Sequence, residues 1–102
     1  MKEKFPFVCS ESQSAAIAEL LGPGFSSNHE YKMNDIFVHL PHSINYNGHR
    51  GDLAVSVVDI SYFSLDGEWK HILVHHEPIP IGGDIFDAFI GMLKWLKENN
   101  LM

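Results

Sequence analysis

Hydrophobic positions recur with a helical period in two parts of the chain, one near each end. In the first part, Ser10 and Gln13 have the spacing of a capping box, in which each side chain bonds a backbone N–H that helix geometry leaves unpaired. Alanines and a face of apolar residues follow, and Gly22-Pro23-Gly24 cannot continue a helix. The pattern predicts a helix over residues 11–21.

The second helix is predicted over residues 85–98. Asp84 is placed to cap its first turn, where the helix dipole also favours the negative charge of Asp87. Two adjacent apolar stripes, with Trp95 beyond them, form a face wider than the ~100° that a helix on one sheet requires. One interpretation of this surplus is that Ile85 to Leu96 packs against a second copy of the chain.

The segment between the helices has the period of extended structure. Ile36, Val38 and Leu40 alternate with the residues between them until Pro41 removes a backbone donor, which predicts a strand that starts near Tyr31. The following residues, 42–52, are rich in Asn and Gly, which tolerate positive φ. We expect them to form an exposed loop or the tip of a long hairpin.

Residues 53–65 are dense in β-branched and aromatic side chains, which predicts a further strand. Its apolar alternation changes phase between Val57 and Val58, and a bulge there would re-aim every later side chain. Asp66-Gly67 is a strong two-residue hairpin turn. The last strand is expected from Trp69 to about Glu77.

These elements predict one compact α+β domain over residues 1–102, in the order α-β-β-β-α, with an antiparallel three-stranded meander packed against the two helices. The chain has 102 residues and 45% hydrophobic content, enough for one core without a metal or a disulfide. The single cysteine, Cys9, favours a reducing, cytoplasmic location. We expect neither a secretion signal nor a membrane span, because no apolar run is long enough.

The net charge of the chain indicates which classes of partner it favours. The chain carries 13 Asp and Glu against 7 Lys and Arg, a formal net charge of -6. Such an excess repels nucleic-acid phosphates and attracts basic proteins over a long range. Most carboxylates lie between Gly51 and Leu93, where Lys70 is the single base. We therefore expect an outward-facing anionic patch around the central hairpin, and no direct binding to nucleic acid or membrane.

The seven histidines are candidates for chemistry, but their spacing predicts no metal site and no cofactor. Histidines 71 and 75 on one strand face would stand about 13 Å apart by strand rise, whereas zinc needs three or four convergent ligands. His39 and His75, expected on neighbouring strands, are the one pair worth testing. Cys9 or a serine could be combined with a histidine and Asp59, but no strained elbow surrounds them, so no catalytic residue is predicted.

The sequence favours a small acidic protein-binding module without enzymatic activity. It would occlude a basic partner such as a toxin or a nucleic-acid enzyme, in the mode of immunity proteins, antitoxins and phage-encoded inhibitors. Aromatic side chains beside carboxylates would supply contact area and steering, with Tyr62 as an anchor. The expected contact residues are Asp52, Asp59, Tyr62, Asp66, Glu68, Trp69 and Glu77.

Two alternatives stay open. One is a homo-oligomeric accessory or structural protein that dimerises through Ile85 to Leu96. The other is a small hydrolase or metal-binding enzyme that uses His39, His49 or His75.

Overall fold

The computed structural model describes residues 6–26, 29–65 and 71–102. Along these residues, two helices are followed by four strands and a third helix, one helix and one strand more than expected. The elements are α1 (Glu11–Leu21), α2 (Met33–His39), β1 (Ser43–Tyr46), β2 (His49–Val55), β3 (Asp59–Leu65), β4 (His71–Pro78) and α3 (Ile85–Glu98).

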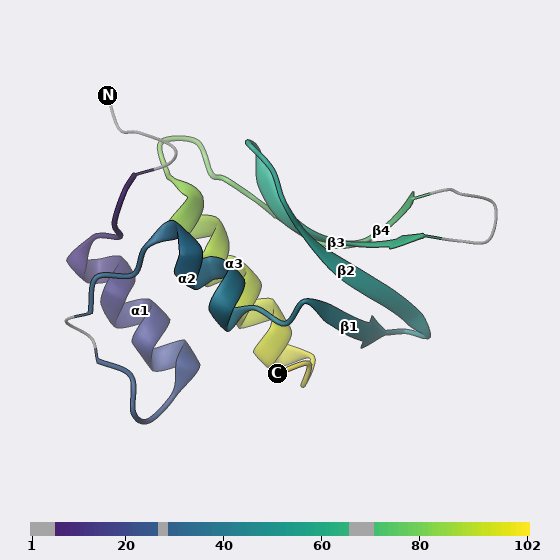
Figure 1. Ribbon diagram of the computed structural model, residues 1–102, viewed down its shortest axis with the longest axis horizontal. Coiled ribbons are helices and arrows are strands. Elements are labelled where there is room, and N and C mark those ends of the chain that lie inside the picture. Colours follow the sequence, from purple (N-terminus) through teal and green to yellow (C-terminus); the bar gives the residue numbers. More distant parts are fainter. Residues whose placement is uncertain (1–5, 27–28, 66–70) are drawn as a thin grey trace.

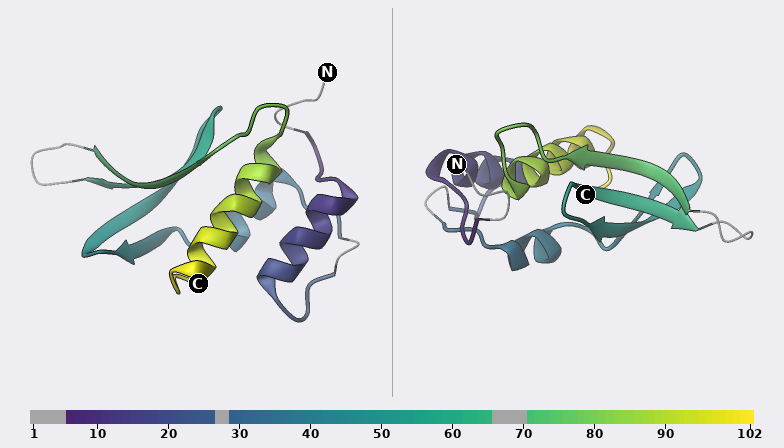
Figure 2. Two further views of the ribbon diagram at one scale, coloured as in Figure 1. Left: turned by 180° about the vertical axis from the view of Figure 1, so that it is seen from behind. Right: turned by 90° about the horizontal axis from the view of Figure 1, so that it is seen from above.

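The four strands form an antiparallel meander in the order β1-β2-β3-β4. Figures 1 and 2 show the helices gathered on one side of this sheet, with α3 between α1 and the strands. No described element packs on the opposite face of the sheet. The chain is thus a compact α+β domain, as predicted, with four strands in place of the three expected.

Both terminal helices begin and end where the sequence places them. At α1, the hydroxyl of Ser10 accepts from Gln13 N–H at 3.2 Å and Oε1 of Gln13 accepts from Ser10 N–H at 2.8 Å, the predicted capping box. Gly22, with φ 98°, ends the helix. At α3, Asp84 caps the first turn by accepting from Phe86 N–H at 2.9 Å.

The wide apolar face of α3 is covered within one chain. The sheet lies on one side of the helix and α1 on the other, and these two surfaces bury most of its apolar side chains. The surplus that suggested a second copy is therefore filled by α1. The buried residues of α3 are Ile85, Phe86, Ala88, Phe89, Met92, Leu93 and Leu96.

The prediction of a strand over residues 36–40 is wrong, because this segment forms α2. Asp35 accepts from Lys32 N–H at 2.7 Å and so satisfies a donor at the helix start. Ile36 and Leu40 are buried and lie four residues apart, so they share one helical face, while Phe37 points to solvent. Positions that are four apart fit both a helix and an alternating strand.

Residues 42–52 form a hairpin, the second of the two expected forms, and its arms are the strand β1 and the first part of β2. β1 and β2 pair from Ser43↔Asp52 to Tyr46↔His49, and Asn47-Gly48 makes the turn between them. Both turn residues have positive φ, 50° and 80°, as the tight hairpin turn with matching twist requires. The added strand of the sheet comes from this hairpin.

The predicted bulge at Val57-Val58 is also wrong. The chain reverses there, since β2 ends at Val55 and β3 begins at Asp59. Ser56 holds the turn, because its hydroxyl donates to Oδ1 of Asp59 at 2.7 Å and accepts from Asp59 N–H at 3.1 Å. A reversal changes the phase of apolar residues just as a bulge does.

A bulge does occur, but in β4. The register passes from Tyr62↔His75 to Phe63↔Leu73, which leaves Val74 as an extra residue. The predicted pairing of β3 with β4 is confirmed, although its turn, Asp66-Gly67, lies outside the described residues. None of the helices in the described ranges combines the length and the apolar character that a bilayer span needs.

Candidate functional site

The sheet has an outer face that turns away from all three helices. Side chains that are paired across strands, or that lie two apart along one strand, share a face. Asp52 pairs with Phe63, Phe63 with Leu73, and Ser61 with His76, so the register assigns this set to one side. We define the outer face by the side chains of Arg50, Asp52, Ala54, Asp59, Ser61, Phe63, Leu73 and His76.

Two of the predicted contact residues, Asp52 and Asp59, lie on the outer face. The Asp52 side chain is 61% exposed, and its Oδ1 lies 3.4 Å from Nε of Arg50. Asp59 is more covered, because it accepts from Ser56 and its Oδ2 lies 3.2 Å from Nδ1 of His76. Asp52 pairs with Phe63, four residues after Asp59, so the two carboxylates stand about 13 Å apart along the strands by strand rise.

Tyr62 and Glu77 lie on the opposite, helix-facing side. The Tyr62 side chain is fully buried and its hydroxyl donates to the carbonyl of Pro41 at 2.8 Å. Burial raises the pKa of Tyr62 well above its usual range, so the phenol stays neutral. Tyr62 is therefore a core residue in this structure and presents no ring to a partner.

The described carboxylates that were expected to form one cluster lie apart and make different contacts. Asp66, Glu68 and Trp69 lie outside the described residues. Asp84 and Asp87 bind the side-chain amide of Gln13, at 2.8 and 3.0 Å, and so join the start of α3 to α1. Within the described part of the chain, Asp52 is thus the most exposed member of the predicted contact set.

An aromatic cluster lies between the sheet and α3. The ring of His75 stacks on Trp95 with centroids 3.9 Å apart and planes within 2°, and Tyr46 meets the same indole edge-on. His75 Nε2 lies 2.8 Å from Oε1 of Glu77. The bulge at Val74 places His75 on the helix side although Leu73 faces outward, and no pattern in the sequence marks that bulge.

The histidines of the enzyme alternative lie on separate elements. His39 ends α2, His49 begins β2 and His75 lies in β4, so His39 and His75 are not on neighbouring strands. Among the residues described, no three His, Cys, Asp or Glu side chains gather closely enough to hold a metal ion. Burial raises the pKa of the Cys9 thiol, which opposes its use as a nucleophile.

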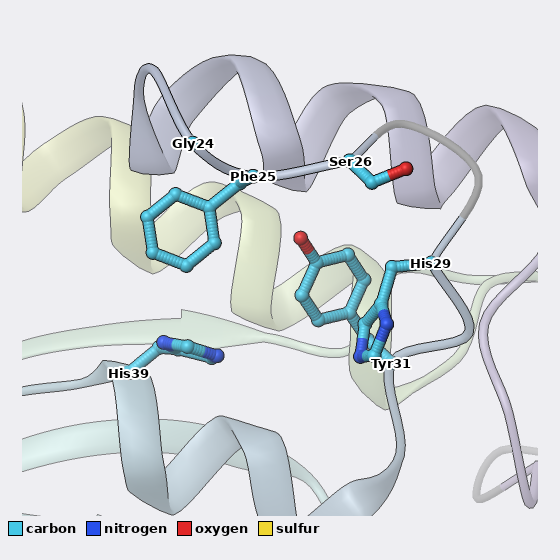
Figure 3. Close-up of a pocket in the computed structure, with 6 residues that line it drawn as sticks. All are labelled: Gly24, Phe25, Ser26, His29, Tyr31 and His39. Atoms are coloured by element: carbon cyan, nitrogen blue, oxygen red, sulfur yellow. The ribbon is translucent and has the colours of Figure 1, made fainter.

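A surface hollow of about 330 Å³ opens between α2 and the segment that follows α1. Figure 3 shows the Tyr31 hydroxyl pointing into the space between Phe25 and Ser26, with His39 below. Neighbouring rings are nearly perpendicular, at 84° for Phe25 with His39 and 76° for Tyr31 with His39. We call this the aromatic hollow; its lining residues are Gly24, Phe25, Ser26, His29, Tyr31 and His39.

Sequence reasoning missed the aromatic hollow because it assigned His39 to a strand. One local signal was available. Asp35, three residues after Lys32, has the spacing of a helix-start acceptor, and a helix from residue 33 brings His39 round to Tyr31.

The comparisons with known proteins give no relative from which a role could be carried over. No protein-family model matches the chain, and neither a curated protein nor a solved structure matches it at a significant level.

Proposed function

We propose that this chain is a protein-binding module without enzymatic activity, which occludes a basic partner by covering it with the outer face of its sheet. The observation that carries the proposal is an antiparallel sheet with one face on which no described element packs, in a chain of net charge -6. The mode is that of immunity proteins, antitoxins and phage-encoded inhibitors, which block a site by docking a folded surface on it.

The outer face combines the two features that such docking requires. Leu73 is 47% exposed and lies opposite Phe63, so an apolar centre is available for burial. Asp52 flanks Phe63 on the next strand and supplies negative charge. Long-range attraction then favours encounter with a cationic protein, and like-charge repulsion disfavours acidic competitors. Asp66, Glu68 and Trp69 remain further predicted contacts.

The two alternatives draw less support from the structure than the docking surface does. Dimerisation through Ile85 to Leu96 was inferred from an apolar face that α1 covers within the same chain. For an enzyme that uses His39, His49 or His75, each histidine would have to act with partners of its own, because the three lie on separate elements, α2, β2 and β4. A heterologous, charge-driven contact is the function that fits the remaining surface best.

The proposal is tested with a decalysine peptide as the model basic ligand, by titration calorimetry at low salt. We expect Asp52→Asn to weaken binding by a factor of about 1.4 to 5, since an exposed ion pair contributes ~0.2–1 kcal/mol. Glu19→Gln removes the same charge from the exposed side of α1 and is the matched control. A smaller effect for Glu19→Gln supports the outer face, and equal effects for both variants would show that net charge alone drives binding.

A second pair of variants tests the same surface by removing positive charges, which should tighten binding instead of weakening it. Arg50→Gln removes the cation 3.4 Å from Asp52 and should tighten decalysine binding. Lys94→Gln removes one exposed cation from α3 and should tighten it less. If Lys94→Gln has the larger effect, the docking surface lies on the helices and the proposal is wrong.

A further inference from the structure

The aromatic hollow has the construction of a site for a compact cation. Its rings belong to two segments, and each pair in contact is nearly perpendicular, at 84° for Phe25 with His39 and 76° for His29 with Tyr31. Perpendicular rings form the adjoining walls of a box, and the electron-rich faces of such walls attract positive charge.

The described lining of the hollow carries no fixed positive charge. None of its lining residues is a lysine or an arginine. Burial raises the pKa of Tyr31, and Cys9 and Asp35 act in the same direction, so the phenol stays neutral. The net charge of -6 adds a long-range attraction for cations.

We propose that the aromatic hollow binds the ammonium group of a lysine side chain carried by the basic partner. This inference rests on the proposed function, because the basic partner named there would supply the lysine. A volume of about 330 Å³ accommodates the end of one such side chain. Tyr31 is 1% exposed and offers no ring face to a ligand, so its contribution is the neutral hydroxyl, which points into the hollow and can accept from the ammonium N–H groups (Figure 3).

The geometry favours lysine over arginine. A guanidinium is planar and stacks best against a parallel ring face. In the hollow, Phe25 and Tyr31 both meet His39 nearly at right angles, which leaves a corner instead of a slot. An ammonium is compact and has no plane, so it can contact two walls of a corner at once.

The test uses small ligands, so that it does not depend on the outer face. Nα-acetyl-lysine amide is titrated into ¹⁵N-labelled protein and followed by amide chemical shifts, with the norleucine and arginine amides as matched ligands. We expect the lysine amide to shift Phe25, Tyr31 and His39, and the other two ligands to bind at least three-fold more weakly.

Two phenylalanines of equal exposure provide the matched variants. Phe25 is 42% exposed in the hollow and Phe37 is 43% exposed on the solvent side of α2. Phe25→Leu should weaken binding of the lysine amide about three-fold, because it removes one ring and keeps apolar volume. Phe37→Leu should leave the affinity unchanged.

The outcomes separate this inference from the proposed function. Norleucine or arginine amides that bind as well as the lysine amide, or a Phe25→Leu variant with unchanged affinity, would overturn the lysine site. Asp52→Asn should not alter the lysine-amide titration. The difference in decalysine affinity between Asp52→Asn and Glu19→Gln therefore tests the proposed function independently of the hollow.

Discussion

Tyr62 shows how one residue changes role when its surroundings are known. It stands on the helix-facing side of β3, where Gly51 on the adjacent strand leaves room for it: a Cβ on that glycine would lie 3.0 Å from the Tyr62 Cβ. The hydroxyl reaches the carbonyl of Pro41 and ties the sheet to the end of α2. A phenol with its donor satisfied can be buried at little cost, and an aromatic anchor for a partner is thereby excluded at this position.

Replacing Tyr62 measures this buried hydrogen bond. Tyr62→Phe keeps the ring and leaves the Pro41 carbonyl without its donor, so the free energy of unfolding should fall by about 1–2 kcal/mol. Urea denaturation followed by tryptophan fluorescence gives the value. Tyr46→Phe, on a ring that packs edge-on against Trp95, is the control and should cost less. A neutral Tyr62→Phe would contradict the core role.

The same substitution predicts a pH dependence. Burial raises the pKa of Tyr62 in the folded state, whereas an unfolded tyrosine ionises near pH 10. A group with a raised folded pKa stabilises the protein fully below the unfolded pKa, and this stability is lost as pH rises above it. The deficit of Tyr62→Phe relative to the parent chain should therefore shrink above about pH 10. A constant deficit would indicate that the phenol ionises freely.

At the scale of elements, the ends of α1 and α3 were readable from the sequence, whereas α2 and most of the β register were not. Ser10 and Asp84 are local signals, because capping needs partners only two or three residues away. Apolar alternation is ambiguous in two ways that this chain displays. Ile36 and Leu40 fit a helix as well as a strand, and the reversal after Val55 imitates a bulge.

The residues of the candidate sites also differ in whether local sequence signals could predict their positions. The exposure of Asp52 could be expected from a polar residue in an alternating strand. The inward position of Glu77 and His75 depends on the bulge at Val74, which is set by pairing with β3. The aromatic hollow depends on α2 packing against the segment after α1, a contact between elements that periodicity does not encode.

Gln13 joins two helix starts and allows their coupling to be tested. Its Oε1 accepts from Ser10 N–H, and its amide donates to Asp84 and Asp87. Gln13→Glu keeps the acceptor but sets a carboxylate against two others, so we expect a loss of at least about 2 kcal/mol in unfolding free energy. Ser12→Ala, at an exposed position of the same turn, should cost less than half of that. Equal losses would show that the bridge between α1 and α3 is unimportant.

For the whole molecule, the distribution of charge matters more than its sum. The acidic residues between Gly51 and Leu93 that the structure describes are divided between the two faces of the sheet and the start of α3. The anionic character of the outer face therefore depends on Asp52 and Asp59 and on the predicted contacts of the β3–β4 turn. Docking on this face would combine modest electrostatic attraction with burial of Leu73 and Phe63.

The two sides of the molecule differ in how much of their surface is open to a partner. α3 is enclosed between α1 and the sheet, so the helical side of the molecule is already packed. The outer face is free of described elements across all four strands. A partner that is covered by this protein should therefore leave α1 and α3 in contact with solvent.

Mapping the amide chemical-shift changes that decalysine causes in ¹⁵N-labelled protein tests the central claim most directly. The account predicts that the largest changes lie on β2, β3 and β4, at outer-face positions such as Asp52, Phe63 and Leu73, and that they fade as salt is raised. Changes concentrated on α1 or α3, or spread evenly over the acidic residues, would contradict it.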